Sequence, residues 1–416
     1  MKVNINKFTG FCGCGKEHKI LVKDIIIESE AIKKLPEIKE GFKNITIICD
    51  ENTYVAAGEE VEEVIPKGNF IKLKSENLHA NEVAVQKVYE CLVAESDVLI
   101  ALGAGTIHDI TRYVAYNKDI PFISVPTAAS VDGFTSTVAD MTWRGYKKTF
   151  TAVSPIYVVA DTDIFKEAPY RLTASGVSDL IGKYIALVDW KISSIVIGEY
   201  ICNRICNMEI DAINKVCQCV DELVLGNTEA YEQLMYALII SGLAMQIIGN
   251  SRPASGAEHH MANLWEMEVI NEHLNAYHGE RVSAALILVM EEYEKIKKAI
   301  ENERCRVKKY SGLEMDMLKE VFRGREMYNS IIKENTPDPL LNVNKVILQN
   351  RLENIAEILE KLPTLDFVKN TLMRAKAVTT FEEIGLPQGI KEKSLRISPY
   401  TTNRLTLMRL SKMLDY

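Results

Sequence analysis

The sequence predicts an α/β fold, in which a doubly wound parallel sheet is followed by an all-α domain. From about residue 44 to residue 161, short β-branched runs alternate with helical stretches. After Asp161, helical periodicity continues and no β-rich run interrupts it. The chain has 416 residues, and at roughly 100–200 residues per domain that length favours two domains. Strands that alternate with helices at this spacing indicate βαβ units and therefore a parallel sheet.

The predicted strands of the first half are apolar runs that suit burial in a parallel sheet. The run ITIIC, which ends at Asp50, is apolar on both of its faces, as such a strand requires. The predicted strands are Ile45–Cys49, Asn69–Leu73, Asp97–Leu102 and Ile120–Val125, with helices over His79–Glu95 and Thr106–Tyr116. A hairpin laid on the sheet is predicted over Thr137–Met141 and Lys147–Thr151.

The second half carries helical periodicity throughout. The predicted helices are Leu172–Ser194, Asn227–Ile248, Ala257–Trp265, Val282–Glu301, Met315–Lys333, Val343–Leu362 and Val368–Thr379. We therefore expect an α/β domain over residues 1–163 and a helical domain over residues 164–416. The cleft between two such domains is the default position for an active site.

Composition limits the class of protein. Hydrophobic residues make up 47% of the chain and charged residues 25%, which excludes disordered and collagen-like chains. The formal charge of −8 argues weakly against a general nucleic-acid binder. The longest apolar run, Tyr236–Gly249, is shorter than the roughly 20 residues of a membrane span, and the N-terminus lacks a signal-peptide pattern. Nine cysteines, an odd number, favour reduced thiols and a cytoplasmic protein.

A glycine turn stands between the third predicted strand and its helix. It comprises Gly103, Ala104, Gly105, Thr106 and Ile107, and it would let a helix N-terminus approach a pyrophosphate. His108 occupies the place where a G-x-G-x-x-G motif has its third glycine, so a plain strand-to-helix turn is an equal alternative. Asp50, after the first strand, would bond a ribose diol, although capping of the next helix is the simpler role for this residue alone.

A second loop of small and hydroxyl-bearing residues follows the next strand. It runs from Pro126 to Gly133 and includes Thr127, Ala128, Ala129 and Ser130. Open α/β sheets bind ligands at the carboxyl edge of their strands, where this loop and the glycine turn both lie. A ligand lying across that edge explains both clusters better than two surface turns.

The helical half contains one carboxylate and two imidazoles that suit a divalent metal. Asp179 and Lys183 share a helix face, His259 lies near the start of a later helix, and His278 opens the next. Such a ligand set leaves open positions for substrate and fits zinc, nickel or iron(II). Each histidine taken alone is more simply a solvated or capping residue. His260 and His273 are interpreted as structural.

Cysteines and a histidine also gather near the N-terminus. Cys12, Cys14 and His18 fall within seven residues, but a four-ligand zinc site needs one ligand more. Cys217 or Cys219 would supply it only if the fold brought them close. The favoured interpretation is a reduced hairpin without metal.

Taken in order, these segments resemble a known family. They are Gly103–Asp109, the loop PTAASVDG and the segments GVSDLIGK, SRPASGAEHH and HGE. They resemble the sn-glycerol-1-phosphate dehydrogenases, which belong to the superfamily of dehydroquinate synthases and iron-containing alcohol dehydrogenases. The similarity is greatest to the bacterial, AraM-type branch, which carries an N-terminal stretch like CGCGKEH, and it covers nearly the whole chain.

The resemblance implies a Rossmann-like N-terminal domain and a helical C-terminal domain that together bind NAD(P) and one divalent metal ion. By resemblance, the catalytic metal ligands are Asp179, His259 and His278, and the substrate contacts are Asp132 and Asn263. Asn263 stands one helical turn after His259, where archaeal relatives often carry histidine. The implied dinucleotide contacts are Asp50, Gly103, Ala104, Gly105, Thr106, Ile107, Thr127, Ala128, Ala129, Ser130 and Ser136.

The implied reaction is hydride transfer between NAD(P)H and dihydroxyacetone phosphate, which gives sn-glycerol 1-phosphate. Lys183 is the first candidate for the phosphate contact and Arg252 the second. Asp50 would repel a 2′-phosphate, so NAD is favoured over NADP. The alternatives are a dehydrogenase of glycerol or another polyol, less readily a dehydroquinate synthase, and a non-catalytic nucleotide- or metal-binding scaffold. A homodimer is expected, with no membrane span and no nucleic acid as partner.

Overall fold

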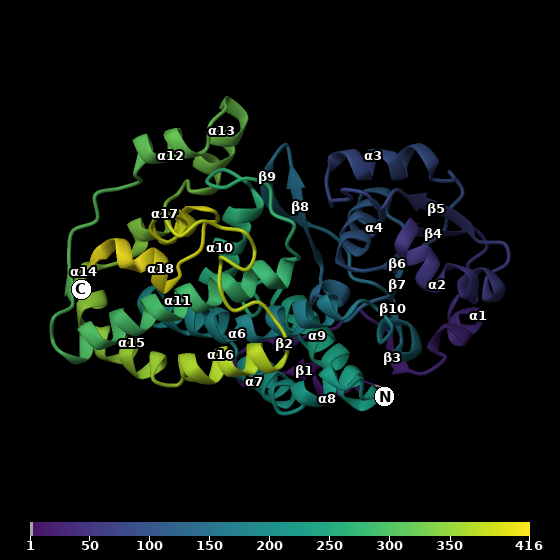
Figure 1. Ribbon diagram of the computed structural model, residues 1–416, viewed down its shortest axis with the longest axis horizontal. Helices are drawn as coiled ribbons and strands as arrows, with labels where there is room; N and C mark the ends of the chain where they lie inside the picture. The colour runs from purple at the N-terminus through teal and green to yellow at the C-terminus, as the bar shows by residue number, and fades with distance from the viewer. Residues whose placement is uncertain (1–2) are drawn as a thin grey trace. The chain divides into compact units, whose positions relative to one another are not determined.

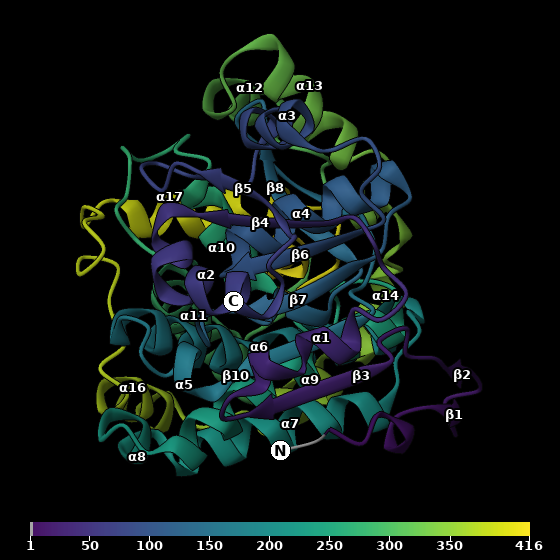
Figure 2. The same ribbon diagram turned by 90° about the vertical axis from the view of Figure 1, so that its right-hand side faces the viewer.

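A computed structural model describes residues 3–416, and its N-terminal part contains a six-stranded parallel sheet (Figure 1). Met1 and Lys2, which begin the segment tested for a signal peptide, lie outside the described residues. The strands follow the order β3-β10-β7-β6-β4-β5, and every neighbouring pair is parallel. They are β3 (Asp24–Glu28), β10 (Tyr157–Asp161), β7 (Phe122–Pro126), β6 (Val98–Gly103), β4 (Ile45–Asp50) and β5 (Asn69–Leu73). Figure 2 shows the strands fanned in this order.

Both faces of the sheet are buried, because alternate residues of each strand point to opposite sides. Ile47 and Cys49 of β4 pack on one side with helix α2 (Glu51–Val64). Ile48 packs on the other side with helices α3 (Glu82–Cys91) and α4 (Gly105–Lys118). This burial explains why the strands read as continuous apolar runs. The short helix α1 (Leu35–Ile38) lies between β3 and β4 along the chain.

Four strands and two helices of this sheet agree with the predicted segments to within a few residues. The edge strand β3 and its neighbour β10 were not predicted. The predicted hairpin is present as β8 (Val138–Trp143) and β9 (Tyr146–Thr151), which form a separate antiparallel pair. Its aromatic residues Trp143 and Phe150 pack against Tyr113 of helix α4, so the hairpin contacts this helix.

The rest of the chain is mainly helical, as predicted. Its helices are α5 (Thr162–Phe165), α6 (Tyr170–Ile197), α7 (Asn203–Gln218), α8 (Val220–Val224), α9 (Thr228–Ile248), α10 (Ala257–Glu266), α11 (His278–Glu301), α12 (Met315–Val321), α13 (Arg325–Glu334), α14 (Lys345–Asn350), α15 (Leu352–Leu359), α16 (Leu365–Arg374), α17 (Ile390–Ile397) and α18 (Leu407–Leu410).

Two predictions in this half were wrong in detail. The single helix expected over Met315–Lys333 is two helices, because Gly324 at φ 94° interrupts it. The helix expected over Val343–Leu362 is likewise divided into α14 and α15. A short β-pair, β11 (Arg306–Val307) with β12 (Leu414–Asp415), also interrupts the helices.

The chain forms two compact units. The first contains residues 1–180 and 207–251, and the second contains residues 181–206 and 252–416. Two of the three boundaries fall inside helices, α6 and α7, and the third lies between α9 and α10.

Helix α9 is the one helix of the described residues that is long and apolar enough to cross a membrane. This helix includes most of the apolar run Tyr236–Gly249, which by itself is too short to span a membrane. Of its most apolar window, 72% is buried inside the protein. Packing in the protein core therefore accounts for its hydropathy.

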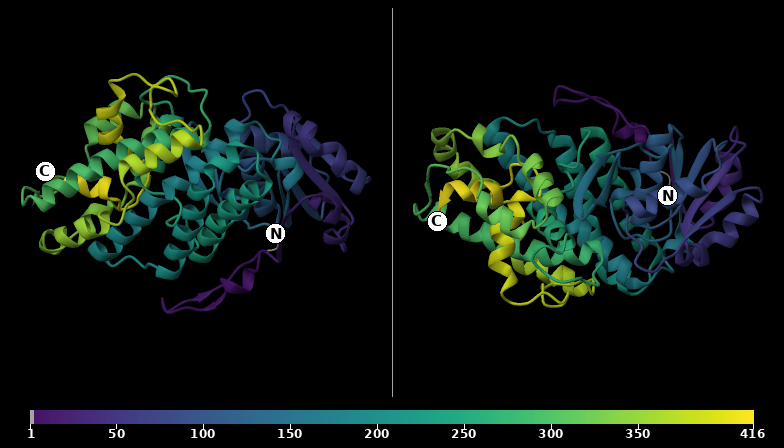
Figure 3. Two further views of the ribbon diagram at one scale, coloured as in Figure 1. Left: turned by 60° about the horizontal axis from the view of Figure 1, so that its bottom comes forward. Right: turned by 90° about the horizontal axis from the view of Figure 1, so that it is seen from above.

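The N-terminal residues form a small hairpin of β1 (Gly10–Phe11) and β2 (Glu17–His18). Figure 3 shows this hairpin lying apart from the six-stranded sheet. Leu21, which follows it, donates its backbone N–H to Gln246 Oε1 of α9 at 2.5 Å. The contact attaches the base of the hairpin to α9.

Candidate metal and dinucleotide site

Helices α6, α10 and α11 supply one carboxylate and two imidazoles. Asp179, His259 and His278 each offer one ligand atom, and these atoms all lie within 4.8 Å of one another. Ligands of one metal ion, each about 2.0–2.2 Å from it, lie at most about 4.4 Å apart, so a small contraction completes the site. The donor set therefore fits a divalent cation.

The long helix α6 passes close to His259 and to helix α11 at Gly182. Gly182 lies one turn after Asp179 on this helix, and a Cβ atom on Gly182 would lie 3.8 Å from His259 Cε1. The same Cβ would lie 2.8 Å from Val282 of α11, so only glycine allows the helices to approach this closely. The imidazoles of His259 and His278 have their ring centroids 5.2 Å apart.

Glu258 orients the His259 ring. Its Oε1 accepts a hydrogen bond from Gly256 N at 2.9 Å and lies 2.7 Å from His259 Nδ1. The Glu258 side chain is fully buried, as a carboxylate behind a metal-bound histidine often is. This contact occupies Nδ1 and leaves Nε2 as the ligand atom. Sequence reasoning missed Glu258, although its place directly before His259 was a signal.

The loop after β7 is joined to Asp179 by a hydrogen bond. The backbone N–H of Asp132 donates to Asp179 Oδ2 at 3.0 Å. The Asp132 carboxylate in turn accepts a hydrogen bond from Ser241 Oγ of α9 at 2.8 Å. The loop and the carboxylate ligand therefore hold each other in place.

The glycine turn forms the start of α4. A Cβ on Gly103 would lie 2.7 Å from Ile107 Cβ, and one on Gly105 would lie 2.9 Å from Val131 Cγ2. Ala104 is the N-cap residue of α4, and its side chain makes no capping hydrogen bond. The N-cap side chain therefore does not satisfy the backbone N–H groups of Gly105, Thr106 and Ile107 in the first turn. Backbone N–H groups at such an end suit an anion.

The neighbouring loop packs closely against α6. The loop residues Thr127, Ala128, Ala129 and Ser130 are all at most 5% exposed. A Cβ on Gly176 of α6 would lie 2.0 Å from the Ala129 carbonyl oxygen, and Ser175 Oγ donates to Ser130 O at 3.4 Å. Thr127 N donates to Gly103 O at 3.1 Å, which places the two predicted loops side by side.

Two of the implied dinucleotide residues have local roles. Asp50 caps α2, because its Oδ1 accepts from Thr53 N at 2.9 Å while Thr53 Oγ1 accepts from Asp50 N at 2.9 Å. The structure therefore shows the helix-capping role of Asp50, which uses one of its two carboxylate oxygens. Ser136 is 1% exposed, and its hydroxyl accepts a hydrogen bond from Val138 N at 3.1 Å.

The residues predicted to contact the phosphate and the rest of the substrate differ in their burial and in their contacts. Lys183 is on α6, one turn after Asp179, and is fully buried. Arg252 forms an ion pair with Glu199, with Nε 2.7 Å from Oε1. Asn263 lies on α10 one turn after His259, and its Oδ1 is buried with no hydrogen-bond partner among the described residues.

The other histidines near the motifs are outside the metal group. His108 is buried, with Nε2 2.7 Å from Ser124 Oγ and Nδ1 2.9 Å from Ala104 O. Its burial lowers its pKa to about 3. Burial also lowers the pKa of His260 well below its usual value, while His273 is exposed and pairs with Glu268.

The chain is similar in sequence to known proteins. The model of the family described as iron-containing alcohol dehydrogenase matches residues 26–169. The glycerol-1-phosphate dehydrogenase (NAD(P)+) of Geobacillus thermodenitrificans is 30% identical, over 99% of this chain and 96% of its own. That of Halalkalibacterium halodurans is 36% identical, over 95% and 94%.

A solved structure shows the fold. The archaeal halo-thermophilic Red Sea brine pool alcohol dehydrogenase matches with a TM-score of 0.63 at 16% identity, covering 97% of this chain and 95% of that one. The predicted α/β architecture with a helical part is therefore confirmed. On the identity and coverage of its relatives, the chain belongs to the glycerol-1-phosphate dehydrogenase family, within the iron-containing alcohol dehydrogenases.

Proposed function

We propose that this chain is an NAD(P)-dependent oxidoreductase that interconverts dihydroxyacetone phosphate and sn-glycerol 1-phosphate. The observation that carries the proposal is the convergence of Asp179, His259 and His278. The hydrogen bond from Asp132 N to Asp179 then couples this group to the loop of the dinucleotide edge. The names of its relatives supply the substrate.

Asp179, His259 and His278 would hold a zinc, nickel or iron(II) ion. A divalent cation bound there supplies Lewis acidity toward a carbonyl oxygen and a neighbouring hydroxyl. Glu258 keeps the His259 ring in one orientation and one tautomer, so that Nε2 faces the ion. Asp179 is fully buried, so its carboxylate is shielded from bulk water.

The carboxyl edge of the sheet would hold the dinucleotide. NAD(P)H, when bound, supplies the hydride. The first amides of α4, at Gly105, Thr106 and Ile107, would donate to the pyrophosphate. Thr127 to Ser130 would line the nicotinamide side, and Ser136 is a further contact by resemblance. The cap at Asp50 uses Oδ1, which leaves Oδ2 for a ribose hydroxyl and favours NAD.

The substrate would contact three side chains. Asn263 carries a buried Oδ1 without a partner, and a substrate hydroxyl would satisfy it. Asp132, already oriented by Ser241, would accept from a second hydroxyl. Lys183 is the proposed cation for the phosphate, because it lies one helical turn after Asp179. Arg252, which pairs with Glu199, is the second candidate.

The proposal also includes a homodimer in the cytoplasm. None of the nine cysteines is in a disulfide, which suits a reducing compartment. Light scattering coupled to size exclusion should give the mass of two chains, and the mass of one chain would contradict the dimer.

The metal ligands are tested with His259→Ala and a matched control, His273→Ala. His273 lies on the surface, where it pairs with Glu268. We expect the first variant to lose one metal equivalent and most turnover of dihydroxyacetone phosphate, while the control keeps both. A His259→Ala protein with wild-type metal content and turnover would refute the ligand assignment.

A further inference from the structure

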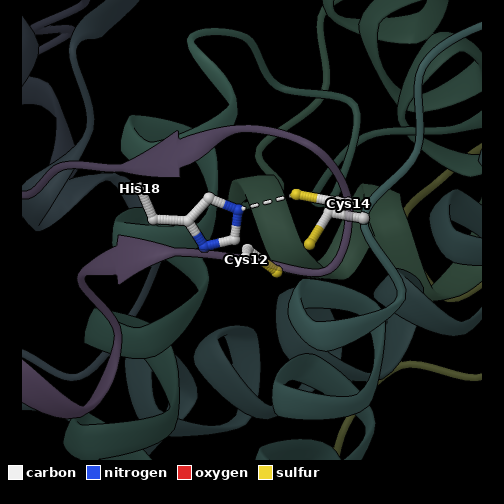
Figure 4. A group of neighbouring side chains, drawn as sticks. Cys12, Cys14 and His18 are labelled. Atoms are coloured by element: carbon white, nitrogen blue, oxygen red, sulfur yellow. Dashed lines mark hydrogen bonds between the residues drawn. The ribbon is translucent and has the colours of Figure 1, made fainter.

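The hairpin near the N-terminus brings three soft ligands to one point. Cys12, Cys14 and His18 lie on and between β1 and β2, and Figure 4 shows their side chains turned toward one another. Cys12 N donates to Lys16 O at 3.0 Å, and Gly15 N donates to Cys12 O at 3.0 Å. Gly15 has φ +84°, a left-handed conformation that closes the turn and suits glycine.

A fourth ligand comes from Cys202, far along the chain. One ligand atom each from Cys12, Cys14, His18 and Cys202 lies within 4.8 Å of the other three. Cys202 directly precedes α7, and its carbonyl accepts the Cys206 N–H at 3.1 Å. It is fully buried and is fixed by that helix. Cys217 and Cys219, which sequence reasoning had considered, are not part of the group.

The spacing of these atoms approaches that of a tetrahedral zinc site. At Zn–S about 2.3 Å and Zn–N about 2.0 Å, a sulfur and a nitrogen ligand lie about 3.5 Å apart. Cys14 Sγ and His18 Nε2 are 3.3 Å apart. Two sulfur ligands would lie about 3.8 Å apart, so the cysteines need to move by about 1 Å or less. Three thiolates and one imidazole form a ligand set that selects zinc over hard cations.

The hairpin itself has little regular structure to stabilise it. Each of its strands has two residues, and Phe11 is 89% exposed, so the hairpin buries little apolar surface of its own. A two-stranded hairpin of this kind is marginally stable in water. A metal bound by the hairpin and by Cys202 would contribute free energy of folding to this segment.

We propose that Cys12, Cys14, His18 and Cys202 bind a structural zinc ion, separate from the metal held by Asp179, His259 and His278. Four protein ligands close the coordination sphere and leave no position for substrate, whereas three ligands leave the other site open. Zinc binds the thiolate form of the three cysteines, so binding releases their protons to solvent. Because oxidised cysteines are not ligands, the site holds zinc only in reduced protein.

The test uses cobalt(II) as a spectroscopic probe of the full-length protein. Cobalt bound by thiolates shows an intense charge-transfer absorption, which the Asp/His/His group cannot produce because it has no sulfur. We expect this absorption in the wild type and in His259→Ala. The double variant Cys12→Ser/Cys14→Ser should lose it, whereas Cys91→Ser, which changes an exposed thiol outside the group, should keep it.

Metal analysis after zinc loading provides a second readout. The wild type should bind about two equivalents per chain, and both the double serine variant and His259→Ala about one. If the double variant does not fold, His259→Ala alone carries the test, because its remaining metal must show the thiolate absorption. Cobalt-loaded His259→Ala without that absorption would overturn the proposal, as would a double serine variant with wild-type zinc content.

Discussion

At the scale of single residues, the Glu258 carboxylate orients the His259 ring and should therefore affect metal binding. Replacing Glu258 by Gln removes the charge that sets the tautomer of the His259 ring, since Oε1 lies 2.7 Å from Nδ1. We expect metal affinity at the Asp179 site to fall roughly 10- to 100-fold, as measured by chelator competition. Glu268→Gln is the matched control, because Glu268 makes the same kind of contact with the exposed His273 at 2.6 Å. An equal loss in both variants would contradict the role of Glu258.

A substitution of Asp50 tests the preference for NADH over NADPH. Serine is also a good N-cap, so Asp50→Ser should keep the start of α2 while removing the negative charge. We expect kcat/KM for NADPH relative to NADH to rise roughly fivefold, equivalent to about 1 kcal/mol. The melting temperature should stay within a few degrees of wild type. An unchanged cofactor ratio would show that Asp50 acts as a cap alone.

His108 gives the fold a defined pH dependence. Its folded-state pKa of about 3 lies below the ordinary value of 6.5 because the ring is buried. The unfolded chain therefore takes up the proton first, and the contribution of neutral His108 to stability is lost as pH falls below 6.5.

We expect this residue to account for about 2 kcal/mol of the unfolding free energy lost between pH 7 and pH 5. Denaturant titrations of wild type and His108→Gln at the two pH values measure the difference. Equal acid sensitivity of the two proteins would contradict this assignment.

At the scale of elements, α6 packs so closely on the loop after β7 that residue 176 has room only for glycine. Gly176→Ala would place a Cβ 2.0 Å from the Ala129 carbonyl oxygen. We expect the unfolding free energy to fall by about 1–3 kcal/mol and NADH to bind more weakly, because the loop must shift. In Gly133→Ala the new Cβ meets no atom within 4 Å, so this control should be nearly neutral. A Gly176→Ala protein as stable as the control would contradict the contact.

Some elements of the fold could be predicted from the sequence, and others could not. Strands β4 to β7 were predicted because buried parallel strands are apolar on both faces. Strand β3, with its run of three isoleucines, carried the same signal and was overlooked. The break between α12 and α13 depends on Gly324, whose positive φ is a property of the folded chain. A single glycine in a periodic stretch does not specify such a break beforehand.

At the scale of the whole molecule, the motifs identified ligands that only the fold could bring together. Asp179, His259 and His278 were candidates because their motifs resemble those of a family, and the structure places their ligand atoms within 4.8 Å. Cys202 was not a candidate, because nothing in the sequence relates it to the distant ligands of the N-terminal hairpin. Glu258 was missed because its contact with His259 Nδ1 depends on how both side chains are oriented in the folded chain. Long-range partners of this kind become visible only when the chain is folded.

The most direct test of the account is the rate of NADH oxidation by metal-loaded protein with dihydroxyacetone phosphate, compared with dihydroxyacetone at the same concentration. The account predicts rapid, metal-dependent oxidation with the phosphate ester and a product of sn-glycerol 1-phosphate configuration. It predicts little oxidation with the unphosphorylated ketone, which lacks the group proposed to meet Lys183. Faster turnover of dihydroxyacetone would instead identify a polyol dehydrogenase and contradict the assignment of dihydroxyacetone phosphate as the substrate.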